Sequence, residues 1–151
     1  MPQDKSIPYV LDEQVGFILR QVNQRHLAIF NERMIADLTA PQFAVLAKLK
    51  EAEPCSQNHL GRLTSMDAAT AKGVIDRMTA RGFITSRSDP GDARRRILSL
   101  TDAGQTLVAE AMPIAAAITE ATLAPLGRAE RRQLLALLKK LRENEDETVG
   151  A

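Results

Sequence analysis

The chain has 151 residues, 44% apolar and 26% charged, a composition that fits one soluble globular domain with an ordinary core. Its net charge of +1 does not by itself indicate a nucleic-acid partner. Aromatic residues are 3% and tryptophan is absent, so we expect a mainly helical fold with an aliphatic interior. No continuous apolar run approaches bilayer length and the N-terminus lacks a signal-peptide core, which argues against a membrane protein and predicts a cytoplasmic one.

The first predicted element is a long N-terminal helix that ends near Ala36. Apolar residues recur along it at spacings of three and four, which places one stripe on the helix: Leu11, Val15, Ile18, Val22, His26 and Ile29. A single stripe of this length needs a partner surface. We therefore expect residues 1–36 to form a helical arm that contributes to dimerisation.

A second helix is predicted to begin after the arm, where Thr39 or Ala40 caps it and Pro41 stands in its first turn. Glu-Ala-Glu-Pro at 51–54 ends this helix. The helix runs through four apolar positions: Phe43, Leu46, Ala47 and Leu49.

Two further helices follow, each with a capping residue at its start. Ser56 caps a short third helix, and Asp67 caps a fourth that ends at Gly82. The apolar positions of these two helices are Leu60, Leu63, Ala71, Val74, Ile75 and Met78. Two helices with a short connection are typical of a helix-turn-helix.

The segment 83–101 predicts a charged β-hairpin. Asp89-Pro90-Gly91 favours a tight turn, because proline fixes φ and glycine accepts positive φ. We place the strands at 83–87 and 96–100, with Phe83, Thr85, Ile97 and Ser99 alternating. Three arginines follow the turn, and guanidinium groups suit phosphates and narrow minor grooves: Arg94, Arg95 and Arg96. Taken alone, such a triplet is more often a solvated turn than a binding site.

Charge is segregated along the chain. From Arg62 to Arg96 there are eight basic and four acidic residues, a net charge of +4. The remainder carries twelve basic and fifteen acidic residues, a net charge of −3. A basic middle between mildly acidic ends is typical of a DNA-reading unit set between helices that do not touch DNA, although chance clustering on a solvated face would give the same pattern.

The C-terminal third predicts two more helices. Thr101 or Asp102 caps a long one that Pro113 should bend, with apolar and small residues at 107, 111, 115, 118 and 122. A second helix over 128–144 repeats leucine in a coiled-coil-like seam at 134, 138 and 141. We expect residues 101–151 to supply core and dimer contacts, because a single domain built from a helix-turn-helix and a β-hairpin does not need them.

The order of helix-turn-helix and two-stranded wing is more specific than the arginines alone. At this point the residues resemble the MarR family of bacterial transcription regulators. The matching segments are Leu38-Thr39, Gln42-Phe43, Leu46, residues 74–78, residues 81–84, and the wing signature Asp92, Arg94, Leu100 and Thr101. The resemblance implies a mainly α fold with a small β wing, a winged helix-turn-helix over 37–100, and dimerisation helices at both ends.

The family resemblance implies that the fourth helix enters the major groove of operator DNA. Its expected contact face is Ala69, Thr70, Lys72, Gly73 and Arg77, with further contacts from Ser56, Gln57 and Asp67. Lys72 and Arg77 are long enough to reach phosphates or guanine edges. Alanine and glycine at 69 and 73 would permit close backbone approach. Asp76 and Arg77 would equally fit a surface pair.

In the wing, Arg94 is expected to enter the adjacent minor groove, while Arg95 and Arg96 contact phosphates. Asp92 would orient Arg94. The chain has Ala93 where relatives often carry a further arginine, so wing affinity is either lower here or maintained by Arg95 and Arg96. A two-fold dimer would place its recognition helices about 34 Å apart and select a pseudo-palindromic operator.

The resemblance also implies a small aromatic or phenolic acid as effector, held where the dimer helices meet the winged domain, and repression as the commoner mode. The candidate residues combine a cationic or hydrogen-bonding group with aromatic walls: Phe17, Arg20, His26, Phe30 and Phe43. A histidine on an apolar stripe is more often a core or interface residue, and Arg20 also fits a surface charge.

Two other functions remain open from the sequence. Cys55, the only cysteine, would act as a redox sensor if its thiol were activated, but no basic residue lies within three positions of it. A winged helix used purely for protein contact is the second. Enzymatic motifs are absent from the sequence, two histidines and one cysteine are too few for a Cys/His metal cluster, and we expect neither a cofactor nor a metal.

Overall fold

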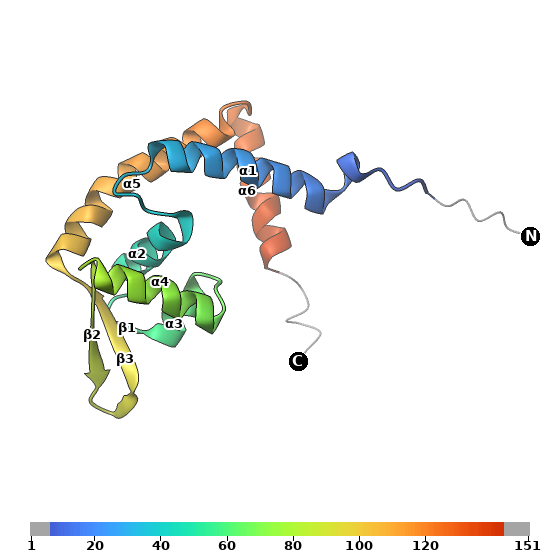
Figure 1. The fold of residues 1–151 in the computed structure, drawn as a ribbon. Coiled ribbons are helices and arrows are strands. Elements are labelled where there is room, and N and C mark those ends of the chain that lie inside the picture. The colour runs from blue at the N-terminus through green and yellow to red at the C-terminus, as the bar shows by residue number, and fades with distance from the viewer. Residues whose placement is uncertain (1–6, 144–151) are drawn as a thin grey trace, which may run out of the picture.

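The computed structural model of the chain describes residues 7–143, which form an arch of helices above a compact winged unit (Figure 1). The arch consists of α1 (Val15–Arg33), α5 (Asp102–Leu123) and α6 (Arg128–Arg142), and a short 3-10 helix, η1 (Leu11–Glu13), precedes it. The winged unit contains α2 (Ala40–Ala52), β1 (Cys55–Ser56), α3 (Gln57–Leu63), α4 (Ala68–Ala80), β2 (Ile84–Asp89) and β3 (Asp92–Leu100). The predicted fold class, mainly α with a small β wing, is confirmed. The division of the chain at 36/37 and 100/101 stays a proposal.

The predicted helix caps are present and fix where the helices begin. Thr39 and Gln42 form a capping box at α2, where each side chain accepts the other residue's backbone N–H. The side chains of Ser56, Asp67 and Thr101 accept backbone N–H groups at the starts of α3, α4 and α5. Gly82, with φ +85°, follows the end of α4 as predicted.

The first helix is shorter than predicted. It begins at Val15, so Leu11 lies in η1 instead, and it ends at Arg33 rather than near Ala36. Ala36 itself has φ +57°, a left-handed conformation that cannot continue an α-helix. Met34 and Leu38 are buried on either side of this turn, and their burial holds the linker against the core.

The sheet has a third strand that was not predicted. The strand residues that point into the core are also the alternate set to those predicted. Its antiparallel order is β1-β3-β2, and two-residue β1 is too short to give a periodic sequence signal. Ile84, Leu98 and Leu100 are buried, whereas Phe83 and Ile97 are only half-buried, so the inward positions are shifted by one. The strands also extend to Asp89 and begin again at Asp92, which places all three wing arginines within β3.

Helix α5 joins the arch to the core. It has 22 residues, of which an 18-residue stretch has mean hydropathy 1.3, so by length and composition it would suffice to cross a membrane, contrary to our sequence-based expectation. Leu107, Val108, Ala111 and Ile118 are instead buried in the protein core, and α5 packs against α1 and α2. Pro113 lies inside the helix, which continues through it and arches (Figure 1).

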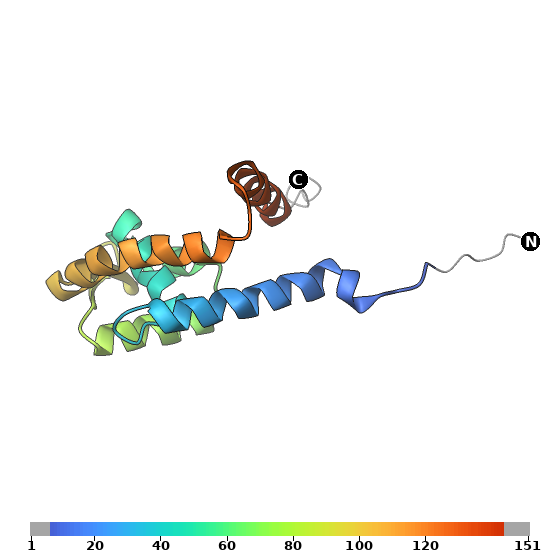
Figure 2. The same ribbon diagram turned by 90° about the horizontal axis from the view of Figure 1, so that it is seen from above.

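Helix α6 contributes no buried residue and lies beyond the end of α5, while α1 and α5 lie side by side (Figure 2). The predicted leucine seam at 134, 138 and 141 is therefore largely exposed in the single chain. The last residue of the predicted helix, Asn144, lies outside the described residues.

Candidate nucleic-acid interface and arm groove

Helix α4 presents a clearly divided surface. Ala71, Val74, Ile75 and Met78 are buried against the winged unit. The opposite face is solvent-exposed and carries the five residues predicted to meet DNA: Ala69, Thr70, Lys72, Gly73 and Arg77. Lys72 forms an exposed ion pair with Asp76, Nζ to Oδ2 2.7 Å, one turn along the helix. Asp76 therefore pairs with Lys72, and Arg77 is left pointing outward.

The capping residues that we predicted as DNA contacts lie at the starts of α3 and α4. The backbone N–H and the hydroxyl of Thr70 both donate to the Asp67 carboxylate. These bonds, chiefly the one from the backbone N–H, lower the pKa of Asp67 below its ordinary value. Ser56 is buried, and its hydroxyl accepts from the His59 N–H at 3.2 Å. Its side chain is thereby committed to starting α3, and a direct DNA contact by Ser56 stays a prediction.

The wing projects from the winged unit on the side away from the arch (Figure 1). All three of its arginines, Arg94, Arg95 and Arg96, are exposed. Together with Ser56, Gln57 and Asn58 they line a polar recess of about 100 Å³. This recess joins the start of α3 to the wing and concentrates guanidinium groups where a phosphate would fit.

The turn fixes the wing backbone through its aspartates. The Asp92 carboxylate accepts the backbone N–H of Arg94 at 3.0 Å, so Asp92 orients Arg94 through its main chain. Asp89 accepts the Gly91 N–H and lies 4.0 Å from the Arg95 guanidinium. The register of β2 and β3 shifts between Ser88, which pairs with Arg96, and Asp89, which pairs with Asp92, so Arg94 and Arg95 lie in the irregular part of the strand.

The arch contains a wide apolar groove of about 620 Å³ between α1, α5 and α6. Its apolar lining includes Ile18, Val22, Leu123, Leu134 and Leu138. Val22 is 50% exposed and Leu141, near the end of α6, is 65% exposed. Side chains of this size seldom face water in such numbers, so this surface needs a covering partner.

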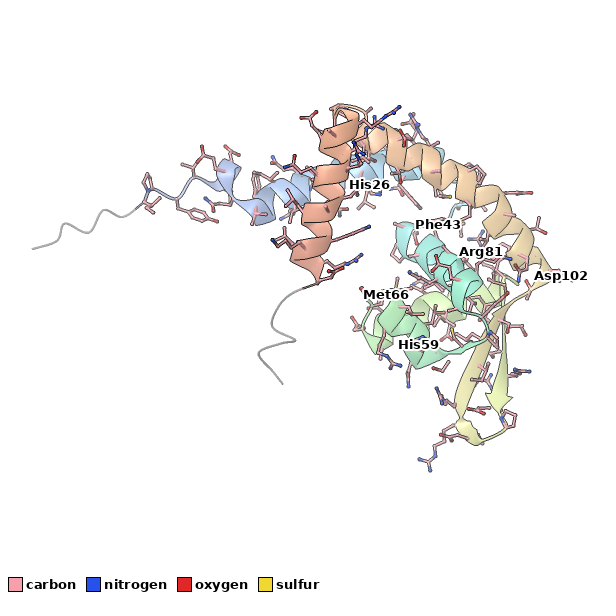
Figure 3. All side chains as sticks on the ribbon, turned by 180° about the vertical axis from the view of Figure 1, so that it is seen from behind. His26, Phe43, His59, Met66, Arg81 and Asp102 are labelled. Atoms are coloured by element: carbon pink, nitrogen blue, oxygen red, sulfur yellow. The ribbon has the colours of Figure 1, made fainter. Side chains whose placement is uncertain are left out.

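Two polar residues of α1 face the end of α5 beside this groove. Arg25 donates to the carbonyls of Thr122 at 2.7 Å and Ala121 at 3.1 Å, where the negative end of the helix dipole favours a cation. His26 Nδ1 lies 2.8 Å from Thr122 Oγ1, at the top of the arch (Figure 3). The Thr122 hydroxyl already donates to Ile118 O, so His26 Nδ1 carries the proton and donates.

Of the five predicted ligand residues, only His26 lines the groove. Phe30 is buried and packs against Phe43 with the ring centroids 6.2 Å apart, so it belongs to the core in this conformation. Phe17 is half-buried and Arg20 is exposed on α1. Their ligand contacts stay predictions. Sequence reasoning missed Arg25, because its role depends on the end of a helix almost a hundred residues away.

Comparison with known proteins agrees with this geometry. Residues 38–95 match the model of the MarR family. The transcriptional repressor NicR of Pseudomonas putida is 39% identical over 95% of this chain and 90% of its own length. The chain belongs to the MarR family. It is therefore a DNA-binding transcription regulator, and proteins of this family are dimeric.

Two solved structures show MarR relatives in functional context. BpsR of Bordetella bronchiseptica, whose DNA binding is regulated by 6-hydroxynicotinic acid, is 40% identical, with a TM-score of 0.88 over 92% of this chain and all of its own. A cysteine-to-serine mutant of Escherichia coli MarR, complexed with operator DNA, is 25% identical, with a TM-score of 0.80 over 89% of this chain and 99% of its own.

A substitution at Gly73 distinguishes what the stability of this MarR fold requires from what DNA binding requires. Apart from the adjoining backbone of α4 itself, no atom of the described residues lies within 4 Å of the Cβ that a side chain would add there, so packing within the chain does not require glycine. We expect Gly73→Ala to raise the free energy of unfolding by about 0.5–1 kcal/mol, because alanine is the better helix former. The same methyl group should weaken operator binding about tenfold by blocking close approach of the major-groove edges. Urea denaturation and fluorescence anisotropy would measure the two effects.

Gly16→Ala is the matched control for this substitution, because Gly16 is also helical and also surrounded by open space. It should share the gain in stability and leave operator affinity unchanged. Equal operator affinity of Gly73→Ala and the wild type would show that α4 does not approach DNA closely at this point.

Cys55 does not have the environment of a redox sensor. It is buried in β1, and burial, followed by the nearby charge of Glu53, raises the pKa of the Cys55 thiol. A raised pKa lowers the fraction of reactive thiolate. The structure therefore disfavours the redox alternative.

Proposed function

We propose that the protein is a repressor that binds a pseudo-palindromic operator as a homodimer and leaves it when a small hydroxylated aromatic acid binds. The observation that carries this proposal is similarity along nearly the whole chain to BpsR, whose DNA binding 6-hydroxynicotinic acid regulates. The name of NicR, a transcriptional repressor, supports the direction of regulation. The exposed α4 face and the arginine wing supply the DNA-binding surface.

A modest ligand site suffices for this response. A tenfold loss of operator affinity requires only about 1.4 kcal/mol of difference between ligand binding to the two dimer shapes. The arms hold α5, and α5 continues directly from the wing strand β3, so a small change at the arm reaches the wing. We place the ligand near His26, with Arg20 as a partner for the carboxylate and with Phe43, which packs on Phe30 one turn of α1 from His26, as an apolar wall.

The test begins with selection of the operator from random duplexes by the purified protein. Fluorescence anisotropy then measures the affinity for this duplex with and without 6-hydroxynicotinic acid. We expect operator affinity to fall at least about tenfold with ligand, and steeply with salt. An unchanged affinity with this ligand and with related hydroxybenzoic acids would contradict control by an aromatic acid, whereas failure to select any duplex would contradict DNA binding.

The ligand site can be tested separately by Arg20→Ala and His26→Ala. Neither side chain lies on α4 or on the wing, so operator binding without ligand should be unchanged. Loss of the cationic or hydrogen-bonding partner should raise the concentration of 6-hydroxynicotinic acid needed for half-release by about tenfold. Gln24→Ala, an exposed substitution on the same helix, is the control. Half-release at the wild-type concentration in both variants would place the ligand elsewhere.

A further inference from the structure

The arch and the winged unit meet where β3 runs into α5 without a loop. Leu100 is the last residue of β3, Thr101 caps the next helix, and α5 begins at Asp102. Any movement of α5 relative to the wing must occur across this junction. The structure places one residue from outside, Glu53, so that it contacts both sides of it.

Glu53 stands at the C-terminal end of α2 and is half-buried. Its Oε2 accepts the backbone N–H of Leu100 at 2.7 Å, on the wing side of the junction. Its Oε1 accepts from the side-chain amide of Gln105 at 2.6 Å, on the arm side. Gln105 Oε1 in turn accepts from Lys50 Nζ at 2.5 Å. One carboxylate therefore joins the end of the wing, the first turns of α5 and helix α2.

The donor and the acceptor of each hydrogen bond in this series, from Leu100 through Glu53 and Gln105 to Lys50, are fixed. Both Glu53 oxygens meet donors, and the Gln105 amide must turn its NH2 toward Glu53 and its oxygen toward Lys50. A flipped Gln105 amide would bring NH2 against the Lys50 ammonium and oxygen against the carboxylate. These hydrogen bonds therefore have only one favourable set of directions, and the link holds the wing and the arm in one relative position.

We propose that Glu53 and Gln105 are positioning residues that hold the wing in its DNA-binding orientation relative to the arm, and that ligand control of DNA binding passes through this link. The second part of the proposal rests on the ligand-responsive function proposed above. Neither residue touches DNA in this account. Glu53 and Gln105 affect how much the wing arginines contribute to operator affinity. They also affect how strongly ligand binding at the arm changes that affinity.

The chain offers an exchange experiment at this link. Gln105→Glu places two carboxylates together and breaks the link. Glu53→Gln removes one acceptor and weakens it. The double variant restores every hydrogen bond, because the amide introduced at position 53 accepts from the Leu100 N–H and donates to the carboxylate introduced at position 105, which also accepts from Lys50. Thr106→Glu adds the same negative charge at the next, exposed position of α5 and is the control for charge.

The first measurement is the loss of operator affinity caused by Arg94→Ala in each background, measured by anisotropy without ligand. A wing that is held less firmly gains less from its arginine, so we expect this loss to be about fivefold smaller in Gln105→Glu than in the wild type. The double variant and Thr106→Glu should show the wild-type loss. If Gln105→Glu merely lowered the folded fraction, Arg94→Ala would cause the same loss of operator affinity in this background as in the wild type. That result would overturn the proposal.

The second measurement is the ratio of operator dissociation constants with and without 6-hydroxynicotinic acid. We expect Gln105→Glu to reduce this ratio about fivefold and the double variant to restore it. An unchanged ratio in Gln105→Glu, with the wild type responding, would overturn the regulatory role. Absence of a response in the wild type would contradict the proposed function, and the Arg94 measurement would still decide the positioning role. If Gln105→Glu does not fold, Glu53→Gln replaces it in both measurements with the same criteria.

Discussion

Arg94→Ala is expected to weaken operator binding by about ten- to a hundredfold, equivalent to roughly 1–3 kcal/mol. Arg94 is exposed near the start of β3, and Asp92 holds its backbone N–H so that the side chain leaves the turn in a defined direction. A narrow minor groove concentrates negative potential and favours a guanidinium group over water. Anisotropy with the selected operator measures the loss, which should be larger for operators with A·T-rich flanks than for those with G·C-rich flanks.

Arg87→Ala is the matched control, since Arg87 is an exposed arginine of β2 and pairs in register with Ile97. Removing it changes the net charge equally and should cost far less. Arg95→Ala and Arg96→Ala should weaken all duplexes alike and reduce the slope of log affinity against log salt by about 0.9 each, as expected for phosphate contacts. The neighbour Ala93 adds no charge, so we expect these two arginines to carry the phosphate contacts of the strand. Equal losses for Arg94→Ala and Arg87→Ala would remove Arg94 from the minor groove.

Gly104→Ala is expected to lower the free energy of unfolding by about 3 kcal/mol, at the upper end of the range for overpacking. A Cβ at this position would overlap the Phe83 carbonyl oxygen, and it would lie 3.1 Å from the Phe83 carbonyl carbon and 3.3 Å from Leu100 Cδ2. The neighbouring backbone cannot easily retreat, because the Thr101 N–H donates to Phe83 O at 3.1 Å and the Thr101 hydroxyl donates to Gly82 O at 2.6 Å.

Thermal and urea unfolding at a fixed protomer concentration would measure this loss, which corresponds to a fall in Tm of roughly 10 °C. Gly16→Ala is again the control, because it adds the same atom into open space. If Gly104→Ala unfolds at the wild-type temperature, the first turn of α5 is free to move away from Phe83, and the junction between wing and arm is looser than the structure has it.

Local chemistry made much of this protein predictable. Thr39, Ser56, Asp67 and Thr101 cap the predicted helices, since a capping side chain acts on backbone groups within three residues of itself. Gly82 ends α4 because the backbone there has a positive φ, which glycine adopts without strain. The exposed face of α4 followed from the 3.6-residue period, which opposes it to buried Ala71 and Val74.

The sequence failed where a position depends on a distant partner. The predicted buried positions of the strands were wrong by one residue. Ile84 and Leu98 are buried because the helices pack on that face of the sheet, which their neighbours in the strand do not determine. The first helix stops early because buried Met34 and Leu38 anchor its linker to the core. The predicted ligand residues divided between core, surface and groove for the same reason.

By itself, therefore, the sequence determined the order of the helices, their caps, the arginine wing and the family, all of which depend on interactions within a few residues. Only the tertiary structure decided that Arg25 and His26 meet the end of α5, and that Glu53 binds both sides of the β3–α5 junction. These contacts join residues about fifty to a hundred positions apart. Their geometry is fixed by how whole elements pack, which no local pattern of residues specifies.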